Sequence, residues 1–95
     1  SALRALSLVD ELTGLYNRRG FLTVAGRTLQ EARQRGTPVL AFYLDMDGFK
    51  GINDAHGHAE GDQALIAMAG VLRATFRESD VIGRMGGDEF VALVT

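Results

Sequence analysis

Apolar residues recur at helical spacing after Asn17, and this spacing predicts a helix of about 18 residues. Asn17 favours the start of the helix because its side-chain oxygen can accept a hydrogen bond from a free N–H group of the first turn. Gly36 and Pro38 favour its end, since glycine adopts positive φ easily and proline lacks the N–H that a helix needs. The expected apolar face consists of Phe21, Leu22, Ala25, Leu29 and Ala32.

A second amphipathic helix is predicted from about residue 59 to residue 76. Its apolar side consists of Ala64, Leu65, Met68, Ala69 and Leu72. Residues 2–9 carry a shorter apolar stripe, which is typical of the end of a helix that arrives from upstream. Residues 10–15, DELTGL, then break this stripe. We therefore expect residues 1–9 to be the end of a linker helix and residues 10–95 to belong to one domain.

Three short apolar runs are typical of strands. Residues 38–47, PVLAFYLDMD, are rich in strand formers and lack alternation, which predicts a strand covered on both faces. Residues 81–85, VIGRM, and residues 90–94, FVALV, flank a GGDE turn and predict a hairpin. A helical crossover between the first two strands predicts a parallel pair, and the hairpin adds an antiparallel neighbour. We expect an α/β (α+β) fold, a mixed sheet with helices packed on it, and a domain that continues beyond Thr95.

Composition narrows the possible functions of the chain. Its 95 residues suffice for at most one small domain, and 46% hydrophobic residues indicate a globular rather than a disordered chain. A net charge of −2 provides no basic field for nucleic acid or an anionic membrane. The absence of cysteine excludes disulfides and zinc–thiolate sites, and it is compatible with the cytoplasm. No apolar run approaches the roughly 20 residues of a membrane helix.

Four carboxylates mark the ends of the predicted strands. Asp45 and Asp47 end the first strand, and Asp88 and Glu89 stand in the hairpin turn. If that strand lies beside the hairpin, the four form an acidic cluster, which is costly unless a cation lies among them. All-oxygen ligands favour Mg²⁺ or Mn²⁺, and Mg²⁺ commonly binds substrate phosphates as well, which points to nucleotide chemistry. The alternative is that Gly-Gly-Asp is ordinary turn chemistry without a ligand.

Other motifs fit poorly. The segment that starts at Asp45 resembles a calcium loop, but Phe49 and Lys50 stand where that loop needs an oxygen ligand and a glycine. The sequence contains neither a P-loop nor a dinucleotide-binding glycine motif. His56 and His58 lack the further ligands that a zinc site requires. Lys50, close behind two aspartates, is well placed to neutralise a phosphate.

Three segments together resemble the N-terminal part of a GGDEF domain, the diguanylate cyclase family. They are residues 10–21, DELTGLYNRRGF, residues 42–62, FYLDMDGFKGINDAHGHAEGD, and residues 77–90, RESDVIGRMGGDEF. Members of this family condense two GTP molecules into cyclic di-GMP. The resemblance implies a palm-like nucleotide-cyclase fold, truncated here at its C-terminal side.

The resemblance also implies roles for individual residues. Asp45, Asp88, Glu89 and the backbone carbonyl of Met46 would bind Mg²⁺ or Mn²⁺. Asp88 would also be the base that activates the ribose 3′-hydroxyl, and Lys50 would contact phosphate. These roles would make the acidic cluster a catalytic centre.

Further residues would bind the base of the substrate and the product. Asn53 and Asp62 would read the guanine edge, and His58 would lie in the substrate pocket. Residues 77–80, RESD, resemble an R-x-x-D inhibitory site, in which Arg77 and Asp80 would bind cyclic di-GMP. Without the neighbouring motif, the same four residues read as a charged turn.

The family's reaction implies partners. Each domain would activate one GTP, so that a homodimer would be the working form, with an upstream sensor domain acting through the N-terminal helix. We expect a cytoplasmic domain, which could be the cytosolic part of a membrane-anchored bacterial protein. One alternative is a catalytically silent module that binds GTP or cyclic di-GMP and regulates a neighbouring phosphodiesterase domain. A purely structural sheet domain would leave the acidic residues unexplained.

Overall fold

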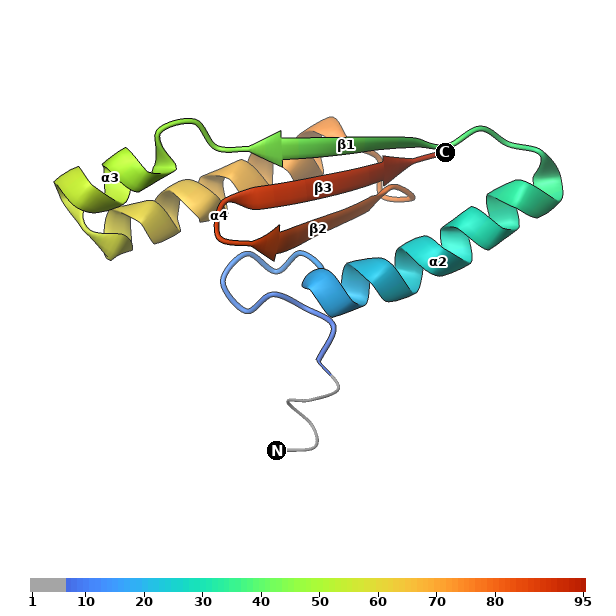
Figure 1. Cartoon of the computed structure of the whole chain (residues 1–95), viewed down its shortest axis with the longest axis horizontal. Coiled ribbons are helices and arrows are strands. Elements are labelled where there is room, and N and C mark those ends of the chain that lie inside the picture. The colour runs from blue at the N-terminus through green and yellow to red at the C-terminus, as the bar shows by residue number, and fades with distance from the viewer. Residues whose placement is uncertain (1–6) are drawn as a thin grey trace.

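The computed structural model describes residues 7–95 and shows helices packed on a small sheet (Figure 1). The elements are α2 (Arg18–Arg35), β1 (Leu40–Asp45), α3 (Phe49–His56), α4 (His58–Thr75), β2 (Val81–Gly86) and β3 (Glu89–Val94). The helix expected in residues 1–9 falls mostly on residues 1–6, which lie outside the described part of the chain. Residues 7–8 are not helical, and Val9 forms an isolated antiparallel bridge with Tyr16.

The sheet has the strand order β1-β3-β2, and both outer strands run antiparallel to β3. The expected combination of helices with a sheet is therefore confirmed, whereas the expected direct pairing of the first two strands is wrong for the described strands. Strands β1 and β2 run in the same direction, as the helical crossover predicts, but they are not neighbours because β3 lies between them. The register pairs Leu40 with Val94 and Asp45 with Glu89, so that the end of β1 meets the start of β3.

Helix α2 has the boundaries that its caps predict. The Gly20 N–H donates to the Asn17 side chain at 2.8 Å, and Gly36 ends the helix with φ 70°. Phe21, Ala25 and Ala32 are buried as expected. The two leucines of the expected apolar face, Leu22 and Leu29, are exposed instead, because they lie at the margin of the stripe that faces the sheet.

Helix α3 was not expected from the sequence, which reads as a polar loop at residues 49–56. The helix is short, none of its residues is buried, and it starts after Gly48, which has φ 75° and provides no side-chain cap. A stretch of eight residues without a side-chain cap lacks the start signal by which a helix is recognised in a sequence. The second predicted helix is confirmed as α4, with its start at His58 and its last residue at Thr75. Within residues 7–95, no helix is long and apolar enough to cross a membrane.

Two apolar clusters hold the helices on opposite faces of the sheet. One cluster joins α4 to the sheet and consists of Leu15, Leu65, Ala69, Leu72 and Phe90. The other joins α2 to the sheet and consists of Phe21, Ala25, Val81, Val91 and Leu93. Successive residues of a strand point to opposite faces, which is why neighbours on β3, Phe90 and Val91, belong to different clusters. Strand β3 is thus buried on both faces, and it holds the GGDE turn at its start in a fixed position relative to the sheet.

Strand β1 is not covered on both faces, contrary to the expectation. It is an edge strand among the described residues, and Leu40 and Tyr43 are 60% and 81% exposed. The Phe42 ring contacts the Phe76 ring in a tilted arrangement, with 5.9 Å between the ring centroids. A run of strand formers indicates a strand, but it does not fix the position of that strand in the sheet.

Candidate functional site

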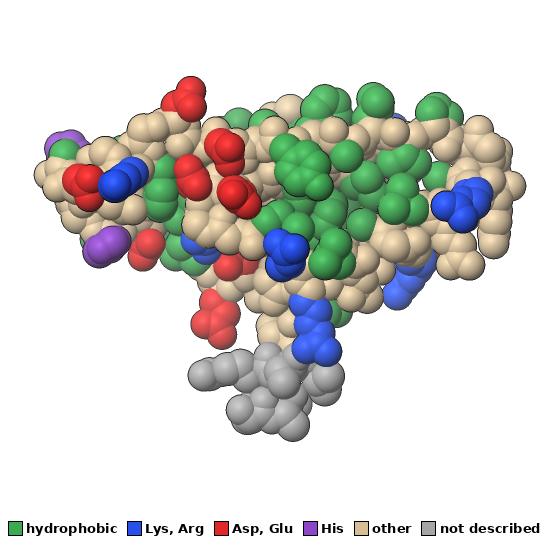
Figure 2. Space-filling model, in the orientation of Figure 1, with side chains coloured by type: hydrophobic (Ala, Val, Ile, Leu, Met, Phe, Trp, Pro, Cys, Tyr) green, Lys and Arg blue, Asp and Glu red, His purple; other side chains and the backbone are tan. Residues whose placement is uncertain are grey.

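Acidic side chains gather where β1 ends and β3 begins (Figure 2). Asp45, the last residue of β1, is the register partner of Glu89, the first residue of β3. Asp88 precedes Glu89 in the turn and is half-buried, whereas Asp45 and Glu89 are exposed. We call Asp45, Asp88 and Glu89 the acidic edge. Asp47 lies beyond the end of β1 in an exposed turn that leads into α3.

The acidic edge has the donor chemistry of a magnesium site but forms no dense cluster. Among residues 7–95, no three His, Cys, Asp or Glu side chains lie close enough together to hold a metal ion. The four-carboxylate cluster expected from the sequence therefore does not form as one group. Two carboxylates that face each other across paired strands still provide the ligand type that Mg²⁺ or Mn²⁺ requires, because Mg²⁺ usually binds through one or two carboxylates together with substrate phosphates. The Met46 carbonyl, at the same edge, accepts a long hydrogen bond of 3.4 Å from the Phe49 N–H.

The turn between β2 and β3 owes its shape to glycine. Gly87 has φ 48°, in the left-handed region that favours glycine, and the β2–β3 register shifts between Arg84 and Gly86. Both glycines are exposed, and an added Cβ at either would meet no atom within 4 Å. The turn therefore presents open backbone to a ligand directly before Asp88.

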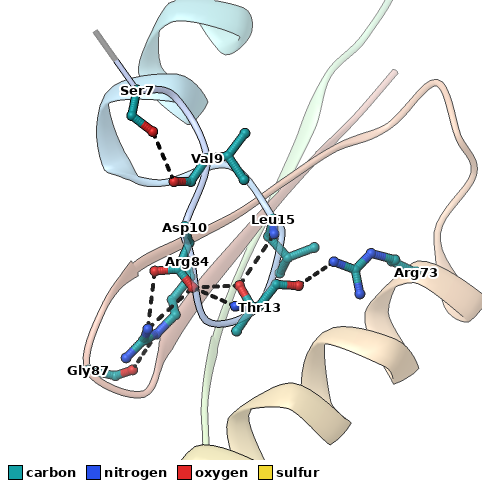
Figure 3. Close-up of polar contacts among 8 residues, drawn as sticks. All are labelled: Ser7, Val9, Asp10, Thr13, Leu15, Arg73, Arg84 and Gly87. Carbon is teal, nitrogen blue, oxygen red and sulfur yellow. Dashed lines mark hydrogen bonds and ion pairs between the residues drawn. The ribbon is translucent and has the colours of Figure 1, made fainter. Parts of the chain in front are cut away.

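Arg84 fixes this turn from the side of β2 (Figure 3). Its Nε donates to the Gly87 carbonyl at 2.8 Å, and its Nη1 donates to both carboxylate oxygens of Asp10 at 3.2 and 3.3 Å. Asp10 also accepts from the hydroxyl and the backbone N–H of Thr13 at 2.7 and 3.0 Å. Neither Asp10 nor Arg84 was expected to act at the site, although both lie inside motifs that the sequence analysis quoted.

The environment of Asp10 favours its charged form. Partial burial alone raises the pKa of this carboxyl group, but the two hydrogen bonds from Thr13 and the positive charge of Arg84 lower it by more in sum. The net result is a pKa below the usual value of 3.8. The Asp10 carboxylate is thus ionised at neutral pH.

The remaining predicted substrate residues are Lys50 and Asn53 on α3 and His58 and Asp62 on the first turns of α4. Helix α3 and the start of α4 extend beyond the end of the sheet (Figure 1). The helices touch closely at Asn53, because a Cβ added to Gly61 would lie 1.8 Å from the Asn53 Oδ1. Lys50, His58 and Asp62 are exposed. No side-chain hydrogen bond or ion pair links any of the four to the acidic edge within the described part of the chain.

The RESD segment forms a closed turn. The Asp80 side chain is only 3% exposed and accepts from the Arg77 N–H at 2.8 Å and from the Arg77 guanidinium at 3.4 Å. Arg77 also donates to the Thr95 carbonyl at 2.8 Å, while its side chain stays 65% exposed. A cleft of about 490 Å³ lies beside this turn, and its lining includes Arg77, Asp80, Arg73, Phe76 and Tyr16. The segment is thus a charged turn, as one reading of the sequence had it, that also borders a cavity.

Comparison with known proteins relates the whole described chain to one family. The family described as diguanylate cyclase, GGDEF domain, matches residues 7–95. The chain is 41% identical over 93 residues to the probable diguanylate cyclase DgcC of Escherichia coli, covering 98% of this chain and 25% of DgcC. It is 43% identical over 93 residues to the cyclic di-GMP phosphodiesterase NbdA of Pseudomonas aeruginosa, covering 98% of this chain and 12% of NbdA. The chain therefore spans a quarter or less of these two relatives.

Solved structures agree with the family match. The GGDEF domain of TpbB from Pseudomonas aeruginosa superposes with a TM-score of 0.87 at 41% identity, over 92% of this chain and 51% of that one. The GGDEF domain of DgcB from Caulobacter crescentus, solved in complex with cyclic di-GMP, gives a TM-score of 0.86 at 37% identity, over 92% of this chain and 49% of that one. The fold thus agrees with that of solved GGDEF domains, and the chain belongs to the GGDEF, or diguanylate cyclase, family.

Proposed function

We propose that the chain belongs to an active diguanylate cyclase, which condenses two GTP molecules into cyclic di-GMP in bacterial signalling. The observation that carries this proposal is the pairing of Asp45 with Glu89 beside the open glycine turn and Asp88. This arrangement offers carboxylates and accessible backbone at one edge of the molecule. A divalent cation would offset the charge of these carboxylates and of the triphosphate of a nucleoside triphosphate at the same time.

The residues of the acidic edge divide the chemistry between them. Asp45, Glu89, Asp88 and the Met46 carbonyl would hold Mg²⁺ or Mn²⁺, which when bound neutralises phosphate charge and polarises the phosphoryl group. Asp88 would accept the proton of the ribose 3′-hydroxyl. Lys50, on the first turn of α3, would add a positive charge to the phosphate side of the substrate.

Guanine recognition is assigned to the junction of α3 and α4. A carboxylate at Asp62 can accept hydrogen bonds from N1 and the exocyclic N2 of guanine, and the Asn53 amide can donate and accept beside it. His58 stands at the start of α4, on the path to the same junction. Adenine would leave the Asp62 carboxylate unpaired, which disfavours ATP.

The proposed reaction requires two domains and permits feedback. Each domain would activate one GTP, and a homodimer would join the two halves of the product. Arg77 and Asp80 would bind cyclic di-GMP, and the exposed Arg77 side chain would exchange its bond to the Thr95 carbonyl for one to a phosphate or a guanine face. An upstream sensor would set the activity, and GTP supply would come from the cytoplasm.

A silent GGDEF module is the second candidate. The observation that favours it is the 43% identity to NbdA, whose name gives phosphodiesterase rather than cyclase activity. In that case the chain would bind GTP or cyclic di-GMP and regulate a neighbouring domain. The full set of Asp45, Lys50, Asp88 and Glu89 favours the active cyclase.

Product formation by the complete protein decides between these candidates, and the Asp88→Asn variant tests the role assigned to Asp88. We expect the complete protein to form cyclic di-GMP from GTP only with Mg²⁺ or Mn²⁺, and Asp88→Asn to lower turnover by about 10²- to 10³-fold, since electrostatic terms dominate phosphoryl transfer. Glu31→Gln, which removes an exposed carboxylate on α2, is the matched control and should leave turnover unchanged. Undiminished turnover in Asp88→Asn would refute the assignment.

A further inference from the structure

Arg84 connects two parts of the molecule that the backbone does not join directly. One is the turn at residues 86–89, called here the GGDE turn, and the other is the N-terminal segment at residues 10–16, called here the anchor segment. The guanidinium group donates to the Gly87 carbonyl through Nε and to the Asp10 carboxylate through Nη1. A planar guanidinium fixes the relative directions of these bonds, which a flexible ammonium would not do.

The bond to the Gly87 carbonyl acts on the peptide group that contains the Asp88 N–H. Two consecutive glycines leave the backbone at residues 86–87 with wide freedom, because no Cβ restricts it. Strand pairing resumes only at Glu89. The Arg84 guanidinium donates to the backbone of this turn from outside it. The peptide group between Gly87 and Asp88 is therefore held by Arg84 as well as by the strand pairing on either side of the turn.

The anchor segment holds Arg84 in turn. The Arg84 N–H donates to the Tyr16 carbonyl at 2.9 Å, and Tyr16 forms a parallel bridge with Gly83. Thr13 is buried and holds the Asp10 carboxylate through its hydroxyl and its N–H. On the other side, Arg73 of α4 donates to the Thr13 carbonyl, so that the anchor segment is tied to a helix as well as to β2.

We propose that Arg84 is a positioning residue for the GGDE turn, and that Asp10 acts on this turn only through Arg84. A shift of the anchor segment would then change the geometry at Asp88 without moving the strands. In its kinetic form this inference rests on the cyclase activity proposed above. In this proposal the anchor segment controls the rate of the reaction and not the binding of the substrate.

Kinetics of Arg84 and Asp10 variants in the complete protein test the proposal. We expect Arg84→Met to lower kcat by about 10- to 100-fold, because a misplacement of about 1 Å has effects of this size. The KM for GTP should change by less than about twofold, since substrate contacts stay in place. Asp10→Asn should lower kcat less, and in the Arg84→Met background it should have no further effect. Additive losses in the double variant would overturn the proposal.

A matched control separates positioning from loss of stability. Val81→Ala removes buried methyl groups at the far end of β2 from the GGDE turn, so that it destabilises the same strand without touching the network. The two variants are compared at temperatures at which the same fraction of each is folded. Under this condition Val81→Ala should keep the parent kcat. Equal kcat losses in the two variants would show that Arg84 only stabilises the fold. If Arg84→Met does not fold, Arg84→Lys replaces it in every comparison. Arg84→Lys keeps the positive charge but lacks the planar guanidinium group.

Amide hydrogen exchange at Asp88 tests the same inference without any enzymatic reaction. In Arg84→Met and in Arg84→Lys we expect faster exchange at the Asp88 and Glu89 amides, with unchanged exchange in the centre of β3. Unchanged exchange at Asp88 would overturn the positioning role even in an active enzyme. Faster exchange in a protein that forms no cyclic di-GMP would instead uphold the positioning role and refute the proposed activity.

Discussion

Alanine at Gly20 and at Gly26 forms a matched pair of substitutions on helix α2. A Cβ at Gly20 would lie 2.0 Å from the Leu8 carbonyl oxygen and 2.9 Å from its carbonyl carbon, whereas a Cβ at Gly26 would meet no atom within 4 Å. The Leu8 carbonyl also accepts a hydrogen bond of 2.9 Å from the Asn17 N–H. Gly20→Ala must therefore displace backbone and break this bond, while Gly26→Ala changes only the helix itself.

The magnitudes follow from these contacts. Gly26→Ala should raise the free energy of unfolding by about 0.8–1.0 kcal/mol, which is the difference in helix propensity. Gly20→Ala gains at most the same amount but costs about 1–3 kcal/mol for overpacking and about 0.5–1.5 kcal/mol for the lost hydrogen bond. The free energy of unfolding of Gly20→Ala should thus lie about 1.5–4.5 kcal/mol below that of Gly26→Ala, as the sum of these two costs.

Urea denaturation of the two variants measures this difference. The comparison is valid where both variants unfold with the parent's m-value, because the free energies then refer to the same exposed surface. Equal free energies of unfolding for Gly20→Ala and Gly26→Ala would refute the close packing of residue 8 on the first turn of α2. The attachment of the N-terminal segment to the domain would then need another explanation.

Three further predictions concern charge and specificity. Hydrogen bonds from Thr13 and the charge of Arg84 hold the pKa of Asp10 below 3.8 in the folded protein. Asp10 therefore stabilises the fold above pH 3.8, and this stabilisation is lost as the pH falls through the folded pKa. In acid denaturation, the difference in unfolding free energy between the parent and Asp10→Asn should shrink over the same pH range. Asp62→Ser should admit ATP, since a carboxylate that a bound adenine covers and leaves unpaired costs about 1–3 kcal/mol, and unchanged GTP/ATP competition would contradict this. Arg77→Ala should abolish noncompetitive inhibition by cyclic di-GMP at an unchanged initial rate, and equal affinity for cyclic di-GMP in calorimetry would leave Arg77 as part of a charged turn only.

Local signals explain what the sequence predicts well. The caps of α2 act within four residues of the helix ends, and the hairpin is encoded by two glycines between two apolar runs. Such features need no knowledge of the remaining fold. The meeting of Asp45 with Glu89 is different, because it depends on the pairing of β1 with β3, and the sequence predicts it only on the condition that the first strand lies beside the hairpin.

Nonlocal contacts explain what the sequence does not predict. The exposure of Tyr43 depends on the position of β1 at the edge of the sheet, and the apolar run alone carries no information on that position. Helix α3 is held by contacts with distant parts of the chain, such as that of Asn53 with Gly61 and the packing of Phe49 against the cluster that contains Phe90. The link between Asp10 and Arg84 joins residues 74 positions apart, which one sequence without relatives cannot pair.

The formation of cyclic di-GMP from GTP by the complete protein tests the central claim most directly. With Mg²⁺ present, chromatography should show one cyclic di-GMP and two pyrophosphates for every two GTP consumed. The rate per protein molecule should rise with protein concentration, because two domains must meet. Bound GTP in calorimetry without any cyclic di-GMP or pyrophosphate would contradict the proposed cyclase and identify the chain as a silent nucleotide-binding module.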